Sequence, residues 1–320
     1  MTHRVETMAY AGEVPWHGLG LPVSNDLSTD EMMNAAGCNW KVISRPLFFK
    51  AINQKSIKVP GKSALVRETD LKVMSVISND WNPVQNDEAF SFFKEFVQAG
   101  SMKMHTAGSL KEGQMVWALA KINQSFSLFK GKDVVESHLL FSNPHEYGKS
   151  VDIRFTPIRV VCNNTLSLAL GKKADLKVTM NHRAKFDAEK VKEALGIAAS
   201  HLDKYKDVAQ FLAARKFKKE SVLEYFTELF PPSKKDLNKD QDNDNKLSRA
   251  ATLSYEALDK QPGHELGEGT WWSAFNSVTY NIDHVLGHKP ESRLNSSWYG
   301  PNRNKKIEAL KLATKYAEVA

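Results

Sequence analysis

Residues 150–171 read SVDIRFTPIRVVCNNTLSLALG, and this stretch predicts one strand that leads directly into one short helix. The apolar residues Val151, Ile153 and Phe155 alternate with polar ones, which is the pattern of a strand with one apolar face. Beyond Pro157 the apolar positions shift by one residue. A bulge at the proline explains the shift, because proline cannot donate to a strand ladder.

Two arginines and two asparagines make this stretch a candidate anion site. With the shifted register, Arg154 and Arg159 fall on the same polar face of the strand. Asn163 or Asn164 then caps the following helix, which is predicted to end at Gly171. A helix N-terminus beside two arginines suits an anion. An ordinary capped helix with two solvated arginines explains the same pattern, so both interpretations stay open.

Positive charge surrounds this stretch. Residues 151–190 contain eight Lys and Arg against four Asp and Glu, a local balance of +4 in a chain whose total is +7. Basic side chains near exposed rings are what a groove for single-stranded nucleic acid needs, whereas a solvated charged face is the alternative. The residues predicted to contact nucleic acid are Arg154, Arg159, Asn163, Asn164, Lys172, Lys173, Arg183 and Lys185.

The remaining pattern divides into a β-rich first half and a helical second half. Strands are expected at 40–51, 56–59, 64–68, 73–78, 102–106, 114–122, 134–141 and 176–180, with a hairpin turn at Pro60 and Gly61. Helices are expected at 28–36, 88–99, 187–212, 221–230, 247–260, 270–287 and 304–319. The predicted class is α+β, with a mixed or antiparallel sheet in the N-terminal half and a mostly helical C-terminal part.

A charged segment suggests where the chain divides. Residues 233–246 hold one apolar residue in fourteen, so they cannot bury a core and are predicted to be mobile. The expected division is a core with a basic face and a long helix at 1–230, a linker at 231–246, and a helical region at 247–320. In that last region Trp271, Phe275, Val278 and Ile282 are expected to form one buried helix face.

The composition excludes several classes of protein. The chain has 320 residues, of which 42% are hydrophobic and 25% charged, as in an ordinary globular protein. Its only cysteines are Cys38 and Cys162, which fits a reducing compartment. No apolar run is long enough for a membrane span, so we expect a cytoplasmic protein. The modest positive charge permits a nucleic-acid partner.

No motif for catalysis, nucleotides or metal occurs. The chain lacks a Walker loop, a GxGxxG after a strand, a GxSxG and an HExxH. His284 and His288 lie four residues apart beside Asp283, but Gly287 falls in the turn between them, which favours ordinary surface histidines. We therefore expect no metal, no cofactor and no enzymatic activity.

Five segments resemble one family. They are PWHGLG at 15–20, NPVQNDEAF at 82–90, FTPIRVVCNNTLSLAL at 155–170, GTWWSAFNSVTYNIDH at 269–284 and YGPNRNKKIEALKLA at 299–313. Together they resemble the phage/plasmid-like proteins that share a domain of unknown function. The resemblance implies a mobile-element setting and transfers no catalytic residue. The β-rich basic half beside a long helix is also similar in architecture to single-strand DNA annealing proteins.

These observations lead to three expectations of different kinds. The leading one is a nucleic-acid-binding protein that binds single-stranded DNA in phage or plasmid recombination or annealing, in the cytoplasm of the bacterial host. The second is a protein-interaction module that binds a host factor, and the third is an enzyme with an unrecognised site. No membrane partner is expected, while a homo-oligomer and a host protein partner are both compatible with the sequence.

Overall fold

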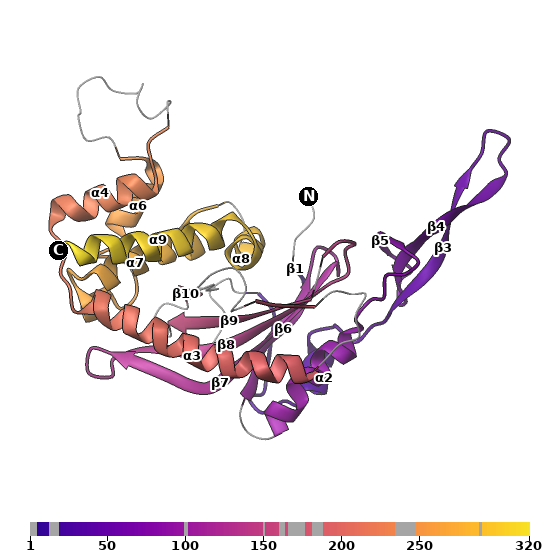
Figure 1. Cartoon of the computed structure of the whole chain (residues 1–320), viewed down its shortest axis with the longest axis horizontal. Coiled ribbons are helices and arrows are strands. Elements are labelled where there is room, and N and C mark those ends of the chain that lie inside the picture. Colours follow the sequence, from indigo (N-terminus) through magenta and orange to yellow (C-terminus); the bar gives the residue numbers. More distant parts are fainter. Residues whose placement is uncertain are drawn as a thin grey trace. The chain divides into compact units, whose positions relative to one another are not determined.

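The computed structural model describes residues 5–12, 19–98, 102–149, 151–159, 164–165, 177–180, 188–233, 247–287 and 290–320. In these residues the chain is an α+β protein, which confirms the predicted class. Strands occupy most of the N-terminal half, and the C-terminal part is helical (Figure 1).

The larger sheet is mixed, and eight of its strands are described. Its order is β10-β9-β8-β7-β6-β1-β2, with β11 also paired to β9. β1 runs parallel to β2 and antiparallel to β6, and β6 runs antiparallel to β7. The strands are β1 Val5–Ala11, β2 Leu21–Val23, β6 Met102–Leu110, β7 Met115–Leu128, β8 Asp133–Pro144, β9 Val151–Arg159, β10 Asn164–Thr165 and β11 Lys177–Met180.

A glycine allows β6 to run further than the sequence indicates. The strand expected to end at Thr106 continues to Leu110, with Gly108 paired to Met8 of β1 and Trp117 of β7. A Cβ atom on Gly108 would lie 2.4 Å from the backbone oxygen of Thr7 and 2.4 Å from the Trp117 ring. Only a residue without a side chain therefore fits at this point between the two neighbouring strands.

A second, antiparallel sheet consists of β3 Val42–Lys50, β4 Ser56–Arg67 and β5 Val73–Ser78, in the order β3-β4-β5. The predicted hairpin turn at Pro60 and Gly61 is wrong, because β4 runs through both residues. Between the pairs Pro46–Ser63 and Phe48–Lys58, β4 has four residues where β3 has one. Proline, which has no N–H to donate, and a glycine at φ +68° fit this irregularity.

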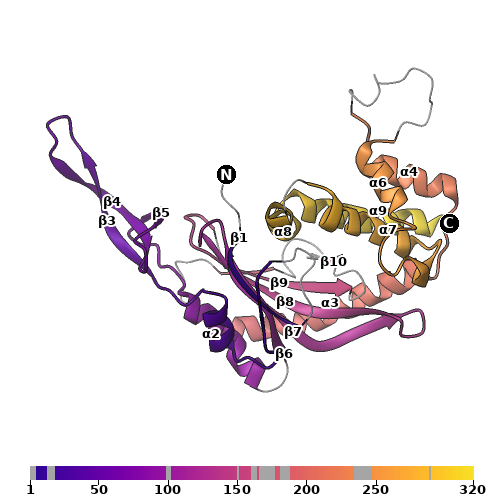
Figure 2. The same cartoon turned by 180° about the vertical axis from the view of Figure 1, so that it is seen from behind.

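The connection between β3 and β4 lies instead at residues 51–55. There the Gln54 N–H donates to the carbonyl of Ala51, and the Ala51 N–H donates to the carbonyl of Lys55. β5 pairs only with Lys62–Val66 of β4, so the far ends of β3 and β4 pair with each other alone. Both views show this two-stranded ribbon running past β5 (Figures 1 and 2).

Two helices pack beside β6. These are α1 Thr29–Ala35 and α2 Asn86–Gln98. α1 begins with the capping box that the sequence predicts. The Glu31 N–H donates to Ser28 Oγ at 3.2 Å, and the Ser28 N–H donates to Glu31 Oε2 at 2.8 Å.

The C-terminal helices confirm most of the predicted ones. They are α3 Ala188–Ala213, α4 Lys219–Leu229, α6 Arg249–Glu256, a short turn at His264–Gly267, α7 Trp271–Tyr280, α8 Pro290–Tyr299 and α9 Pro301–Glu318. The helix expected at 270–287 ends as α7 at Tyr280 and continues as a π-helical turn at Asn281–Val285. The helix α8 is additional to those that the sequence predicts.

The expected buried face of α7 is confirmed. Trp271, Phe275, Val278 and Ile282 are all at most 1% exposed. The Trp271 ring lies 5.7 Å from Tyr225 of α4, measured between ring centroids. These rings form the aromatic centre of the helical core.

Backbone contacts group the chain into two compact units. The first comprises Met1–Asn123, His138–Phe155 and Gly171–Gly196, and the second comprises Gln124–Ser137, Thr156–Leu170 and Ile197–Ala320. This grouping differs from the division that the sequence suggests, because α4 packs against both α6 and α9. Helices on both sides of the charged segment thus belong to one unit. Residues 234–246 of that segment lie outside the described residues, so its mobility stays a prediction.

Candidate nucleic-acid interface

The structure places Arg154 inside the protein. It lies on β9 and is 9% exposed, while Ile153, Phe155 and Thr156 on both sides of the strand are buried as well. β9 has β8 on one edge and both β10 and β11 on the other. The prediction that Arg154 lies on a polar face is therefore wrong, because residues 153–156 are all buried and both faces of β9 are covered there.

The expected helix start after β9 also differs. Asn164 and Thr165 form β10, in which Asn164 pairs with Arg159 and Thr165 pairs with Ile158. Asn164 is therefore a strand residue and does not cap a helix. The other predicted contacts lie outside the described residues: Asn163, Lys172, Lys173, Arg183, Lys185 and the side chain of Arg159. The role of these residues in binding nucleic acid stays a prediction.

A different basic surface is present on the two-stranded ribbon. We call β3, β4 and the residues that join them, 42–67, the arm. The arm contains six Lys and Arg and no Asp or Glu. Arg67 at its base is buried, and the other cations are exposed. These exposed cations are Arg45, Lys50, Lys55, Lys58 and Lys62.

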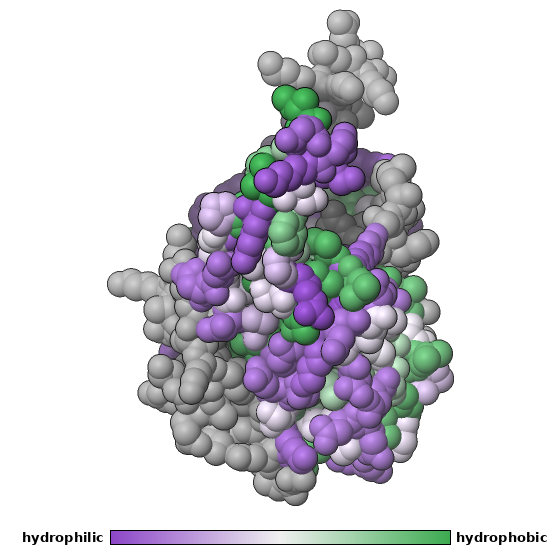
Figure 3. Space-filling model, turned by 90° about the vertical axis from the view of Figure 1, so that its right-hand side faces the viewer, coloured by the Kyte–Doolittle hydropathy of each residue, from purple (hydrophilic) through white to green (hydrophobic). Residues whose placement is uncertain are grey.

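Large apolar side chains lie exposed among these cations. Phe48 and Phe49 are 55% and 52% exposed, Ile57 is 40% exposed, and Ile52 in the connecting residues has no cover at all. Figure 3 faces the side toward which the arm extends in Figure 1, and it shows hydrophobic and hydrophilic residues interspersed. Basic and apolar side chains are thus both accessible to solvent on the arm.

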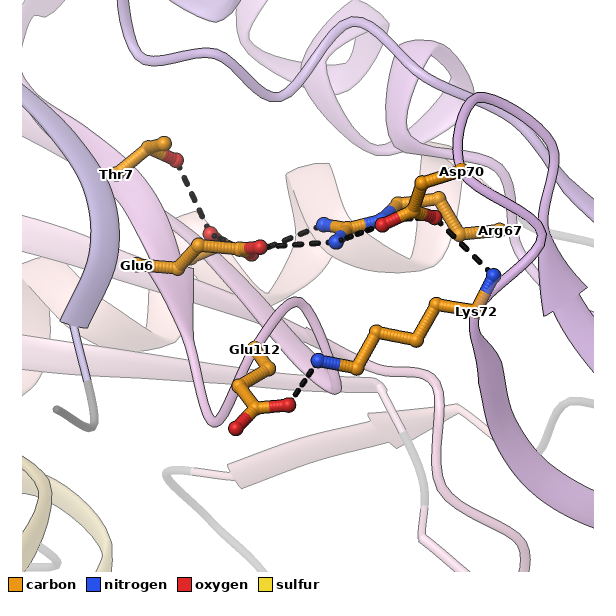
Figure 4. Close-up of polar contacts among 7 residues, drawn as sticks. Glu6, Thr7, Arg67, Asp70, Lys72 and Glu112 are labelled. Carbon is orange, nitrogen blue, oxygen red and sulfur yellow. Dashed lines mark hydrogen bonds and ion pairs between the residues drawn. The ribbon is translucent and has the colours of Figure 1, made fainter. Parts of the chain in front are cut away.

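The base of the arm is held by a charged network (Figure 4). Arg67 donates from Nη1 and Nη2 to the two carboxylate oxygens of Glu6 on β1, at 3.0 and 2.9 Å. It also donates from Nε and Nη2 to Asp70, at 3.0 and 2.6 Å. Such paired, charge-assisted contacts fix a guanidinium in both position and orientation. The network therefore ties the end of β4 to β1.

The contacts at the base also shift the pKa values of the groups that make them. The Arg67 guanidinium holds the pKa of Asp70 at about 2, mainly through the hydrogen bonds between them. The same carboxylates raise the pKa of Arg67, so the arginine stays charged. Beside the network Lys72 pairs with Glu112, which follows β6 (Figure 4). The cation at the base is therefore neutralised, in contrast to those along the arm.

The sequence contains a signal for the arm. The 26 residues 42–67 contain no acidic side chain, and Phe48 and Phe49 directly precede Lys50. Pro46 within the strand expected at 40–51 is typical of an edge or bulged strand, and β3 lies at the edge of its sheet with an irregular register after Pro46. The same pattern does not reveal that β3 and β4 extend beyond their sheet, because alternation indicates a strand and not what covers it.

The helical core contains a buried ion pair between Asp283 and Lys306, which we interpret as structural. Asp283 and Lys306 are fully buried, and Lys306 Nζ donates to the two Asp283 oxygens at 2.8 and 3.1 Å. Ser297 Oγ donates to the same carboxylate at 2.7 Å. Burial lowers the pKa of Lys306, an effect that Asp283 opposes. In the described parts of the chain, no three His, Cys, Asp or Glu side chains gather into a metal-binding group.

The fold and the arm define a class: an α+β protein with an exposed basic ribbon. The chain belongs to the family described as Domain of unknown function (DUF932), whose model matches residues 73–299. The match begins at the first residue of β5, so β3 and β4 precede it. No curated protein and no solved structure matches the chain. Among the described residues, no helix combines the length and hydrophobicity needed to cross a bilayer.

Proposed function

We propose that this chain binds nucleic acid, with single-stranded DNA as its ligand, and that the arm is a main contact surface. The observation that carries the proposal is the arm itself: five exposed cations and no acidic residue on a ribbon that also exposes aromatic rings. Cations that follow a phosphate backbone and rings that stack on bases are the two features that single-strand binding requires. No reaction is part of this proposal.

The setting of the proposal comes from the resemblance to phage/plasmid-like proteins. In phages and plasmids a cytoplasmic protein that binds single strands would act in recombination or strand annealing, with other copies of itself as partners. The family description assigns no activity, so this setting rests on the resemblance alone. The basic segment around Lys172, Lys173, Arg183 and Lys185 is proposed as a second contact surface.

The arm's cations have no acidic residue on their own strands, whereas several exposed lysines elsewhere are paired with one. Elsewhere Lys41 pairs with Asp87, Lys94 with Asp30 and Lys103 with Asp26. A polyanion would therefore meet an uncompensated positive surface on the arm and a compensated one at those pairs. This contrast supports the arm over those paired lysines as the site of phosphate contacts.

Binding of a host protein is the second candidate function, and exposed Phe49 and Ile52 favour it. The centre of a protein interface is typically apolar, so exposed apolar side chains such as these could be buried against a partner. A purely protein-binding arm, however, gains nothing from five like charges unless that partner is acidic. The nucleic-acid proposal explains the rings and the charges together.

The test is a titration of labelled single-stranded oligonucleotide at several salt concentrations. The triple variant Lys50→Ala, Lys55→Ala and Lys58→Ala should weaken binding for all sequences, because phosphate contacts carry no base information. Its salt slope should fall by about 2, because each phosphate that is no longer neutralised removes roughly 0.7 from the slope for a single strand.

The matched control removes the same charge from the helices. Lys204→Ala, Lys219→Ala and Lys311→Ala change three exposed lysines on α3, α4 and α9. This variant should keep most of the affinity and the slope. Absence of binding by the parent protein at low salt would refute the proposal. An equal loss of affinity in both triple variants would show that only net charge matters. Lys172→Ala with Lys173→Ala tests the second surface.

A further inference from the structure

The two faces of the arm carry different side chains. In an antiparallel pair, residues directly opposite each other point to the same face, and successive residues alternate. Phe48 lies opposite Lys58, and Lys50 lies opposite Ser56, so these four side chains share one face. Phe49 lies opposite Ile57, and this pair takes the other face. At the far end of the arm, one face is thus basic with a single ring, while the other is apolar.

The apolar face is exposed without a core to cover it. Beyond β5 the ribbon has only two strands, and isolated two-stranded ribbons gain little from packing. Phe49 and Ile57 are still about half exposed, although they are cross-strand neighbours. Ile52 extends the apolar surface to the end of the arm. Burial of these side chains against a ligand would remove apolar area from water, which favours association.

From this separation we infer that the Phe49–Ile57 face and Ile52 contact unpaired bases, while Lys50 and Lys58 on the opposite face follow the phosphates. The inference rests on the proposed function, and it names the form of nucleic acid that the arm recognises. A single strand presents base faces to a ring, and such stacking tolerates any sequence. A duplex keeps its base faces stacked inside the helix.

Charge argues against a second copy of the arm as the cover for this face. Two arms packed through their apolar faces would combine ten exposed cations in one assembly with no acidic residue on either arm, even though Lys50 and Lys58 would lie on the outer faces. Like charges within one assembly repel. A polyanion offers the complementary charge and, when single-stranded, the apolar base faces as well.

The experiment separates the bases from the phosphates by means of two probes of equal length. One is a 20-residue oligothymidylate, and the other is an abasic phosphodiester strand that keeps the charges and lacks the bases. The variant Phe49→Ala with Ile57→Ala should bind oligothymidylate roughly 10-fold more weakly than the parent, as loss of stacking predicts. Its affinity for the abasic strand should be unchanged.

Two controls accompany this variant. Val73→Ala with Val76→Ala removes exposed apolar side chains of β5, in the same sheet but off the arm, and should leave both affinities unchanged. Phe49→Trp keeps an aromatic ring at the same position and should retain binding to oligothymidylate. Circular dichroism and urea unfolding establish that each variant is folded.

The outcomes distinguish this inference from the proposed function. If the parent binds neither probe, the proposed function is wrong. If the parent binds both probes equally and Phe49→Ala with Ile57→Ala changes neither affinity, nucleic-acid binding stands and base contact by this face is refuted. A third outcome concerns duplex DNA, because a β-ribbon can enter a major groove. If the parent bound a 20-base-pair duplex more tightly than oligothymidylate, and Phe49→Ala with Ile57→Ala abolished duplex binding, the inference would also be overturned.

Discussion

The arm and the core around α7 contain the same kinds of residue, namely aromatic rings and cations. The core buries and pairs these residues, whereas the arm exposes them. In the core, Trp271 and Phe275 are covered completely, and the ammonium of Lys306 is paired with Asp283. On the arm, Phe48, Phe49 and five cations face solvent. Rings and charges that are buried and paired stabilise a fold. The same groups left exposed and uncompensated are available to a ligand.

The cause of the difference is the number of neighbouring elements. α7 packs against α6 and α9, and its residues 271–279 are all buried. The far ends of β3 and β4 meet only each other. Substitutions should therefore reduce stability in the core and leave it almost unchanged on the arm, and the following predictions test this difference.

The largest effect is expected at the buried ion pair. Lys306→Met should lower the free energy of unfolding by about 5 kcal/mol, because it leaves the Asp283 carboxylate buried without its cationic partner. Urea denaturation followed by circular dichroism measures the change. The double variant Lys306→Met with Asp283→Asn should recover much of the stability. If the single variant were as stable as the parent, the pair would not be buried as described.

Two phenylalanines provide the direct comparison between the regions. Phe275→Ala should destabilise by about 4 kcal/mol, as large-to-small changes in cores do. Phe49→Ala on the arm should change stability by less than about 0.5 kcal/mol, since the ring is already half exposed. Both values come from the same urea titration. Similar destabilisation in the two variants would contradict the distinction between core and arm.

Arg67 belongs to the arm, but it is buried and paired like the charged residues of the core. Arg67→Met should destabilise by about 2 kcal/mol, the change expected when a charged hydrogen-bond network to Glu6 and Asp70 is removed. Arg67→Lys should restore only part of this, because an ammonium cannot make the paired contacts of a guanidinium. Full restoration by lysine would show that charge alone matters there.

The smallest effect is a dependence on pH. The pKa of Asp70 is about 2 in the folded protein against an ordinary 3.8, so its ion pair with Arg67 stabilises the fold above about pH 4. This contribution is lost as the pH falls through about 2. The difference in unfolding free energy between the parent and Asp70→Asn should shrink over that range. Asp259→Asn, at an exposed site in the helical unit, is the control for removing a carboxylate.

The candidate site is harder to predict than the fold. Local patterns identify the α1 capping box, the strand β5 and the long helix α3 with nearly correct bounds, because caps and periodicity depend on neighbours in the chain. Alternation along β9 predicts a solvated face for Arg154, and that prediction is wrong. Both faces of β9 are covered around Arg154, and alternation within a strand does not show what covers its faces.

The sequence by itself determined the α+β class, the buried face of α7 and the absence of acidic residues from 42–67. The family membership also follows from the sequence. Only the tertiary structure decided which charges are exposed. It buried Arg154, Lys306 and Arg67, and it left the cations of the arm in water. Exposure depends on elements that are distant in the chain and adjacent in space, and no local pattern contains that information.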